Sequence, residues 1–170
     1  MEAPSGPGRR ESAELSMQDL TASLKSLLRP GDTLWWGQAT AEPIMLTRAV
    51  AAHRHALAQG GRLRVFVGIG NSDTLRPEQA DAIDFFGYIA GGTHRALAQA
   101  GVLDALPSHY SHLPGLIRAG VLAADVALVQ VSPPDAHGRH SLGLVHEYLT
   151  AALEKARVVI AEVNTGIPWT

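Results

Sequence analysis

Short apolar segments with the character of strands alternate with helical segments along most of this chain, and that alternation limits the folds it can adopt. The apolar runs cover residues 33–37, 64–69, 83–89, 124–131 and 158–163. They are mostly apolar, at consecutive positions and not only at every second residue, which is typical of strands buried on both faces. The alternation predicts an α/β fold with an open, mainly parallel sheet and helices on both of its faces.

The segments between these runs carry helix signals. Apolar residues at helical spacing predict helices over residues 16–28, 44–58, 95–100, 113–118 and 146–156, with a short helical turn at 77–81. Ser16 is a suitable N-cap for the first helix, and Pro43 fits the start of the second, where a missing N–H costs nothing. A further strand is predicted around residues 108–110, and a hairpin-like segment at 138–144.

Composition narrows the classes of function. The 170 residues suffice for one domain with a sizeable core, which we expect over residues 15–170 behind a flexible Pro/Gly-rich segment at 1–14. The 14 basic and 16 acidic residues form no basic stripe, which argues against a nucleic-acid partner. The chain has no cysteine and no apolar run near the ~20 residues of a membrane helix. We therefore expect a cytoplasmic protein without disulfides, thiolate metal sites or membrane contact.

Ligands of open parallel sheets bind beyond the carboxyl ends of the strands. The loops expected there are rich in glycine, small hydroxyls, amides and histidine: Gln38, Gly70, Asn71, Ser72, Gly92, Thr93, His94, His109 and His112. Such residues let a ligand approach the backbone and donate neutral hydrogen bonds. The loops at Gln38 and Gly92 are also expected to open helices, whose free N–H groups favour a carboxylate or phosphate. Because ordinary βα turns use the same residues, a shared pocket is a hypothesis that rests on the whole set.

Other site types find little support in the residue spacings. His109 and His112 stand three apart in a loop, whereas zinc sites use His-x₃₋₅-His on a helix or paired cysteines, so no metal is expected. The stretch VGIGNSD lacks the third glycine of the dinucleotide fingerprint, and no phosphate-loop lysine follows. Ser111, His112 and Asp73 could form a triad on paper, but no Gly-x-Ser-x-Gly elbow exposes a serine.

Three carboxylates of the chain are candidates for reactive groups. Glu42 and Glu147 lie beside expected helix starts, where a negative charge is stabilised and its reactivity reduced. Glu162 lies inside an apolar strand, where an unpaired carboxylate is costly. We therefore expect an arginine or histidine partner for Glu162.

The stretch VQVSPPDAHGRHSLG joins a buried strand to a proline-fixed turn and a glycine-rich return. The two prolines end the strand ladder, and Asp135 and Gly138 shape the turn. His137 and His140 are expected to be turn or interface residues.

Six segments follow one another in a characteristic order: GDTLWWGQATAEPIMLTRAV, RVFVGIG, FFGYIAGGTHRAL, LPSHYSHLPGLI, ADVALVQVSPPDAHGRHSLG and VVIAEVNTGIPWT. Together they resemble the N-terminal domain of the acetyl-CoA hydrolase / 4-hydroxybutyrate CoA-transferase family over about residues 31–170. The most specific parts are VSPPDAHGRHSLG and AEVNTGIP.

The resemblance implies one half of a CoA-transferase-like (NagB/RpiA/CoA-transferase-like) fold. In that family the catalytic glutamate belongs to a C-terminal domain that this chain does not contain. The N-terminal domain holds the acyl group or its carboxylate, with loops that correspond here to residues 70–72 and 92–94. The resemblance thus implies a CoA thioester as substrate, no permanently bound cofactor, and a second CoA-transferase-like subunit, in a heterodimer or heterotetramer, that supplies the nucleophile.

The sequence leaves other functions open. The chain could be a truncated product, a non-catalytic structural or regulatory partner of a catalytic subunit, or a stand-alone hydrolase in which His112 activates water. Within the chain itself, His112 and Glu162 are the candidates for catalytic groups. The reaction itself could be CoA-thioester exchange, hydrolysis, or a derived acyl transfer or cyclisation.

Overall fold

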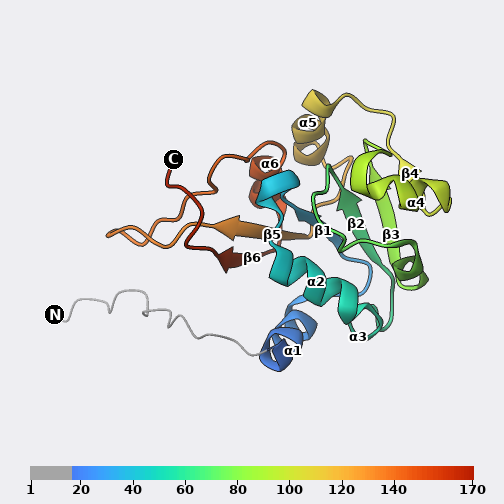
Figure 1. Ribbon diagram of the computed structural model, residues 1–170, viewed down its shortest axis with the longest axis horizontal. Helices are drawn as coiled ribbons and strands as arrows, with labels where there is room; N and C mark the ends of the chain where they lie inside the picture. Colours follow the sequence, from blue (N-terminus) through green and yellow to red (C-terminus); the bar gives the residue numbers. More distant parts are fainter. Residues whose placement is uncertain (1–16) are drawn as a thin grey trace.

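The protein folds around a six-stranded parallel sheet, seen in a computed structural model that describes residues 17–170 (Figure 1). The strand order is β4-β3-β2-β1-β5-β6, and every neighbouring pair runs parallel. The strands are β1 Thr33–Trp36, β2 Leu63–Val67, β3 Ile83–Gly87, β4 Leu103–Ala105, β5 Val126–Val131 and β6 Val158–Val163. The predicted fold class is therefore confirmed.

Helices cover both faces of the sheet, as its predominantly apolar central strands require. The helices are α1 Met17–Leu27, α2 Ile44–Ala52, α3 Arg54–Leu57, α4 Arg95–Gln99, α5 Leu113–Arg118 and α6 Leu149–Lys155. Short 3₁₀ turns are η1 Ala39–Ala41, η2 Pro77–Asp81, η3 Gly92–His94 and η4 Tyr110–His112. The flexible segment expected at residues 1–14 and the N-cap expected at Ser16 lie outside the described residues.

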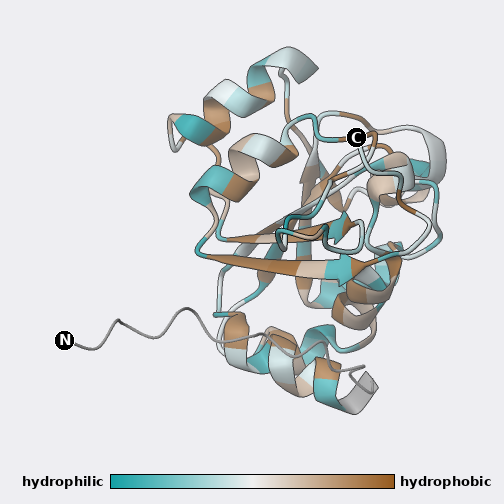
Figure 2. Ribbon diagram, turned by 90° about the vertical axis from the view of Figure 1, so that its left-hand side faces the viewer, coloured by the Kyte–Doolittle hydropathy of each residue, from teal (hydrophilic) through white to brown (hydrophobic). Residues whose placement is uncertain are grey.

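Two hydrophobic clusters fill the space between the sheet and its helix layers. Figure 2 shows helices on both sides of the largely hydrophobic strands. One packs α1, α2, α3 and α4 on one face, and the other packs α5 and α6 on the opposite face. Trp35 anchors the second cluster: its ring stacks on Phe66 at a centroid distance of 4.0 Å, and its indole N–H donates to the carbonyl of Ala123. Among residues 17–170, no helix has the length and apolar character needed to cross a membrane.

Three local predictions were wrong in position. The fourth strand is Leu103–Ala105 and not residues 108–110, because Pro107 cannot donate to a strand ladder and ends the pairing before it. The helix expected over 44–58 is interrupted at His53. The last helix begins at Leu149 and not at 146, since Glu147 adopts a positive φ of 41° that no helix accommodates.

The order of the strands fixes where a ligand crevice can form. From β1 the chain builds outward through β2, β3 and β4, and it then returns to the other side of β1 with β5 and β6. The direction of building thus reverses between β1 and β5. In open α/β sheets, the carboxyl ends of the two strands at such a reversal border the ligand crevice.

Candidate functional site

Gln38 joins the loops that follow the first three strands. Its side-chain oxygen accepts hydrogen bonds from the backbone N–H of Ile69 at 2.9 Å and from the hydroxyl of Tyr88 at 2.8 Å. The next residue, Ala39, has a positive φ of 51° and donates its N–H to the carbonyl of Ile69 at 2.7 Å. The carboxyl ends of β1, β2 and β3 are therefore linked at one edge.

Gly70, Thr93 and His94 form the closest contact at this edge. The hydroxyl of Thr93 donates to the carbonyl of Gly70 at 2.8 Å. A Cβ atom at Gly70 would lie 2.3 Å from Nε2 of His94, so only glycine allows the imidazole to pack here. Two of the predicted binding loops, residues 70–72 and 92–94, are thus in direct contact.

His94 is a buried base, with only 6% of its surface exposed. Its Nδ1 atom is buried and has no hydrogen-bond partner among the described residues. Burial lowers the pKa of His94 from its usual value, and the negative charge of Glu42 opposes this shift. Burial thus favours the neutral form of the His94 imidazole.

Glu42 is the central carboxylate of the edge and is also buried. Its Oε1 atom accepts hydrogen bonds from Thr47 at 2.9 Å and from Ser72 at 2.8 Å. The oxygen of Ser72 also lies 2.9 Å from the hydroxyl of Thr74. Ser72 thus belongs to a hydroxyl network around an acid. The sequence had suggested only that a nearby helix start stabilises Glu42.

Glu162 has a different partner from the one expected. Its Oε2 atom accepts hydrogen bonds from the backbone N–H groups of Met45 at 2.9 Å and Leu46 at 3.3 Å. The predicted arginine or histidine partner is therefore wrong: the start of α2 binds this carboxylate instead. Burial raises the pKa of Glu162, the two backbone bonds oppose this shift, and Glu42 adds to it. The discrepancy arises because β6 is an edge strand with alternating exposure, not a strand buried on both faces.

The two helix starts that were expected to bind anions begin with short 3₁₀ turns and not with α-helices. Gln38 and Gly92 stand at the beginnings of η1 and η3, which are 3₁₀ turns of three residues each. Turns of this length carry little of the dipole of an α-helix. The longer helix at this edge, α2, has two of its first N–H groups bound to Glu162.

The two histidines at η4 lie apart from this network. His109 and His112 are exposed, and their rings contact each other at a centroid distance of 5.6 Å. Asp73 binds Arg76 at 3.0 Å and Arg48 at 3.5 Å, so it does not complete a triad with His112. No group of three metal-ligating side chains occurs among residues 17–170.

The sequence did not predict a group of three neighbouring tyrosines: Tyr88, Tyr110 and Tyr148. Tyr88 and Tyr110 have ring centroids 5.1 Å apart, and the hydroxyl of Tyr148 donates to the carbonyl of Trp36 at 2.9 Å. Burial raises the pKa of Tyr110, and the carboxylate of Glu147 raises it further. The available signal was that each tyrosine comes at a strand end or just before a helix, where an aromatic ring can be buried.

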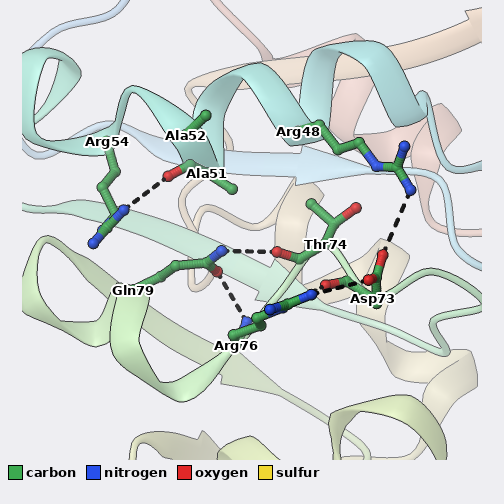
Figure 3. Close-up of a pocket in the computed structure, with 8 residues that line it drawn as sticks. All are labelled: Arg48, Ala51, Ala52, Arg54, Asp73, Thr74, Arg76 and Gln79. Carbon is green, nitrogen blue, oxygen red and sulfur yellow. Dashed lines mark hydrogen bonds and ion pairs between the residues drawn. The ribbon is translucent and has the colours of Figure 1, made fainter.

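A cavity of about 430 Å³ lies between α2 and η2 and is flanked by arginines (Figure 3). Arg48 and Arg76 share the carboxylate of Asp73, whose pKa is lowered mainly by its hydrogen bond with Arg76. Arg54 donates to the carbonyl of Ala51 in this view, and it also binds Asp81 outside it. Because each guanidinium already has an acidic partner, this cavity resembles a structural clamp more than an anion site.

A second cavity, of about 190 Å³, lies at the reversal between β1 and β5. Its lining is mostly apolar and comes from three loops: Thr40, Ala41, Leu142, Leu144, Val145, Gly166, Ile167 and Pro168. The sequence did not single out these lining residues as a pocket, because three separate segments supply them and these segments meet only in the folded chain.

The proline-rich stretch forms the predicted turn. The carboxylate of Asp135 accepts the backbone N–H groups of His137 and Arg139, and Gly138 has a φ of 74°. Nδ1 of His140 lies 2.8 Å from the carbonyl of Ser132. These contacts confirm a turn, and the two histidines lie within it.

Comparison with known proteins identifies the family. A model of the acetyl-CoA hydrolase/transferase N-terminal domain matches residues 20–170. This chain belongs to the acetyl-CoA hydrolase/transferase family. The resemblance inferred from the six ordered segments is therefore confirmed.

Two curated relatives of this family define how much of such a protein the chain represents. It is 30% identical over 135 residues to 4-hydroxybutyrate coenzyme A transferase of Clostridium kluyveri, covering 79% of the chain and 31% of the relative. It is 33% identical over 146 residues to butyryl-CoA:acetate CoA-transferase of Anaerostipes caccae, covering 84% and 32%. The chain spans about a third of the length of these relatives.

Solved structures of the family share the fold. A 4-hydroxybutyrate CoA-transferase from Porphyromonas gingivalis aligns over 88% of this chain and 33% of its own, with 28% identity and a TM-score of 0.62. RipA from Yersinia pestis aligns over 91% and 40%, with 26% identity and a TM-score of 0.74.

Proposed function

We propose that this chain forms the acyl-holding side of an acyl-transfer site in a CoA-transferase-like enzyme, and that a second subunit supplies the catalytic glutamate. The observation that carries the proposal is the family match over residues 20–170 of a chain that spans a third of its curated relatives. Two of these relatives are named as CoA transferases acting on 4-hydroxybutyrate and on butyryl-CoA and acetate.

The chemistry of the edge supports a holding role. Its hydroxyl, amide and imidazole groups are neutral, and Glu42 is bound by two hydroxyls and lies in a buried position. A carboxylate so buried and bound is a weak nucleophile. Neutral donors can orient a substrate carboxylate and leave it reactive. A guanidinium clamp would instead bind the carboxylate so strongly that its nucleophilicity is lost.

The reaction follows from the family resemblance. The glutamate of the second subunit attacks the acyl carbonyl of an acyl-CoA, and the C–S bond breaks to release the CoA thiolate and leave a mixed anhydride. The thiolate then attacks the glutamyl carbonyl, which gives a glutamyl-CoA thioester and frees the acid. A second acid reverses these steps and leaves as its CoA ester, whereas water would complete a hydrolysis. Our proposal assigns to this chain the orientation of the acyl group through both stages.

Two alternative functions make different demands on the edge of the sheet. A non-catalytic partner would leave the edge without a substrate role. Stand-alone hydrolysis would need a base beside a bound thioester, and His112 is exposed, with its ring against His109.

The test is to isolate the tagged chain from its own cells, identify the chain that copurifies, and assay both preparations. We expect the complex to exchange CoA between butyryl-CoA and acetate, and the chain alone to be inactive. Replacing Ser72 and Thr93 by valine should lower kcat/KM of the complex about tenfold or more without dissociating it. Normal turnover of an assembled variant would favour the non-catalytic role. Activity of the chain alone that is lost in His112→Ala would favour the stand-alone hydrolase.

A further inference from the structure

The strand β6 leaves one edge of the sheet open. It is the outermost strand on the side opposite β4 (Figure 1), and among residues 17–170 it pairs with β5 alone. The N–H groups of Val158 and Asn164 bond to carbonyls on the β5 side. Because successive residues of a strand direct their backbone groups to opposite sides, the even-numbered residues of β6 bond to β5. The odd-numbered residues therefore direct their N–H and C=O groups to the open edge: Val159, Ala161 and Val163.

The residues of β6 do not protect this edge from pairing. Edge strands of monomeric proteins are commonly short, or carry charged residues or proline, because a long apolar edge binds other strands. At the opposite edge of the sheet, β4 follows this rule, since it has three residues and an exposed Asp104. In contrast, β6 has six residues, and all but Glu162 are apolar. The carboxylate of Glu162 is held by the backbone of α2 and not at the open edge.

Apolar side chains border the open edge on both faces of the sheet. Val159 and Val163 are 48% and 55% exposed, and they belong to neither of the two hydrophobic clusters. On the opposite face, Met45 at the start of α2 is 56% exposed and donates its N–H to Glu162. An added strand would satisfy the free backbone groups and cover these side chains together.

A second copy of β6 fits the open edge in an antiparallel arrangement. A two-fold axis perpendicular to the sheet keeps each face of one copy beside the same face of the other. With the axis at Ala161, the smallest side chain of the strand meets its own copy. Val159 then lies opposite Val163 of the second copy, and Glu162 lies opposite Ile160. Apolar residues thus face one another, and the two carboxylates are kept apart.

The two neighbouring registers are less favourable. An axis at Glu162 would set the two carboxylates directly opposite each other, which destabilises a strand pair. An axis at Ile160 would set Val163 opposite Arg157, whose guanidinium is bound to Asp32 of its own chain at 2.7 Å. The charges of the strand therefore select the register that is centred on Ala161.

We infer that two copies of this chain associate through β6, antiparallel and centred on Ala161, so that their sheets form one continuous sheet. The inference does not rest on the proposed function. If both hold, the enzyme contains two copies of this chain, which corresponds to the heterotetramer and not to the heterodimer.

The first experiment measures the assembly of the full chain. Sedimentation velocity should show a dimer of twice 18.0 kDa, with a dissociation constant of about 10 µM or less. Val159→Lys places a charge at the open edge and should raise this constant about tenfold or more. Val121→Lys is the matched control, because Val121 is 69% exposed but follows α5, away from β6, so the dimer should persist.

The second experiment removes a backbone donor. Ala161→Pro eliminates the N–H that faces the second copy at the axis. An edge strand tolerates proline where the N–H points outward, so pairing with β5 should remain while the dissociation constant rises about tenfold or more. Circular dichroism and urea denaturation check the fold. If Ala161→Pro does not fold, Val163→Lys replaces it, because that side chain is exposed.

The third experiment fixes the register. The chain has no cysteine, so Ala161→Cys carries a single thiol. In the dimer the two thiols lie opposite each other, with Cβ atoms about 4.5–5.5 Å apart, and a short bis-maleimide should link them. Asp104→Cys places an exposed thiol on β4 at the other edge of the sheet, and the same reagent should leave that variant unlinked.

The outcomes separate this pairing from its alternatives. A monomer at about 100 µM, well above the expected dissociation constant, would overturn the pairing. A dimer that Val159→Lys and Ala161→Pro leave unchanged would overturn the role of β6, and a dimer that does not link through Ala161→Cys would overturn the register. A link from Ala161→Cys to a chain of different sequence, in preparations from the cells of origin, would show that another protein covers this edge. None of these results changes the acyl-holding role, which turnover of the complex tests.

Discussion

Ser72 donates a hydrogen bond to Glu42 at 2.8 Å, although 30 residues separate them along the chain. The bond joins the loop after β2 to the segment between η1 and α2. One of the two residues was predicted as a ligand contact and the other as a stabilised acid. The structure shows that they form one unit, so the loop at residues 70–72 is held in place by a buried carboxylate.

Removing the hydroxyl of Ser72 should destabilise the fold. Ser72→Ala removes one of the two hydroxyl donors to the buried carboxylate of Glu42, and the loss of that hydrogen bond should cost about 1–3 kcal/mol in the free energy of unfolding. Urea denaturation measures this loss. Ser26→Ala is the control, because Ser26 makes only an exposed local bond and should change stability little. Equal stability of both variants would show that the bond to Glu42 is not significant.

A methyl group at Gly70 should disturb the contact with His94. In Gly70→Ala the new Cβ would lie 2.3 Å from Nε2 of a buried ring that has little room to move. We expect a loss of about 1–3 kcal/mol in the free energy of unfolding and shifted resonances at Thr93. Gly115→Ala meets no atom within 4 Å and lies in α5, so thermal unfolding of that variant should match or exceed the parent.

The stability of the protein should fall in mild acid because of His94. Its folded-state pKa lies below the usual 6.5, so the unfolded chain takes up the proton first as the pH falls. The contribution of His94 is therefore fully present above pH 6.5 and is lost as the pH falls through the lowered pKa. Urea midpoints between about pH 7.5 and pH 5.5 should change less in His94→Gln than in the parent. His109→Gln, at an exposed site, should retain the dependence of the parent.

Glu162 should show the opposite dependence. Its folded-state pKa is raised from 4.5, so its contribution to stability is present below that pH and is lost as the pH rises through the raised value. Glu162→Gln should therefore gain stability relative to the parent at neutral pH, and this gain should shrink toward pH 4.5. Glu154→Gln is a control of opposite sign, because Arg118 lowers the pKa of Glu154. A gain in Glu162→Gln that is constant with pH would contradict the prediction.

Much of the architecture could be predicted from local pattern. The runs ending at Trp36, Val67 and Val131 are predominantly apolar, and the structure makes each a central strand that is buried along most of its length. The fourth strand could not be placed, because Leu103–Ala105 is short, largely exposed and paired only with β3. Its assignment depends on a neighbour in space and not on its own residues.

The candidate site was only partly predictable. Glycine and hydroxyl residues marked the loops at Gly70 and Thr93, and the structure brings these two loops together, while their binding role stays a prediction. The partner of Glu162 could not be predicted, since it is the backbone of α2, more than a hundred residues earlier in the chain. Backbone donors have no signature in a sequence.

The sequence alone determined the class of this fold and its family, because buried parallel strands need continuous apolar runs and the family's turns need particular glycines and prolines. The tertiary structure alone decided which loops meet. The cavity between Ala41, Val145 and Ile167 exists because β5 returns beside β1. The buried carboxylate of Glu42 is bound by the hydroxyls of Thr47 and Ser72. Both depend on contacts between residues far apart in the chain, which local patterns do not record.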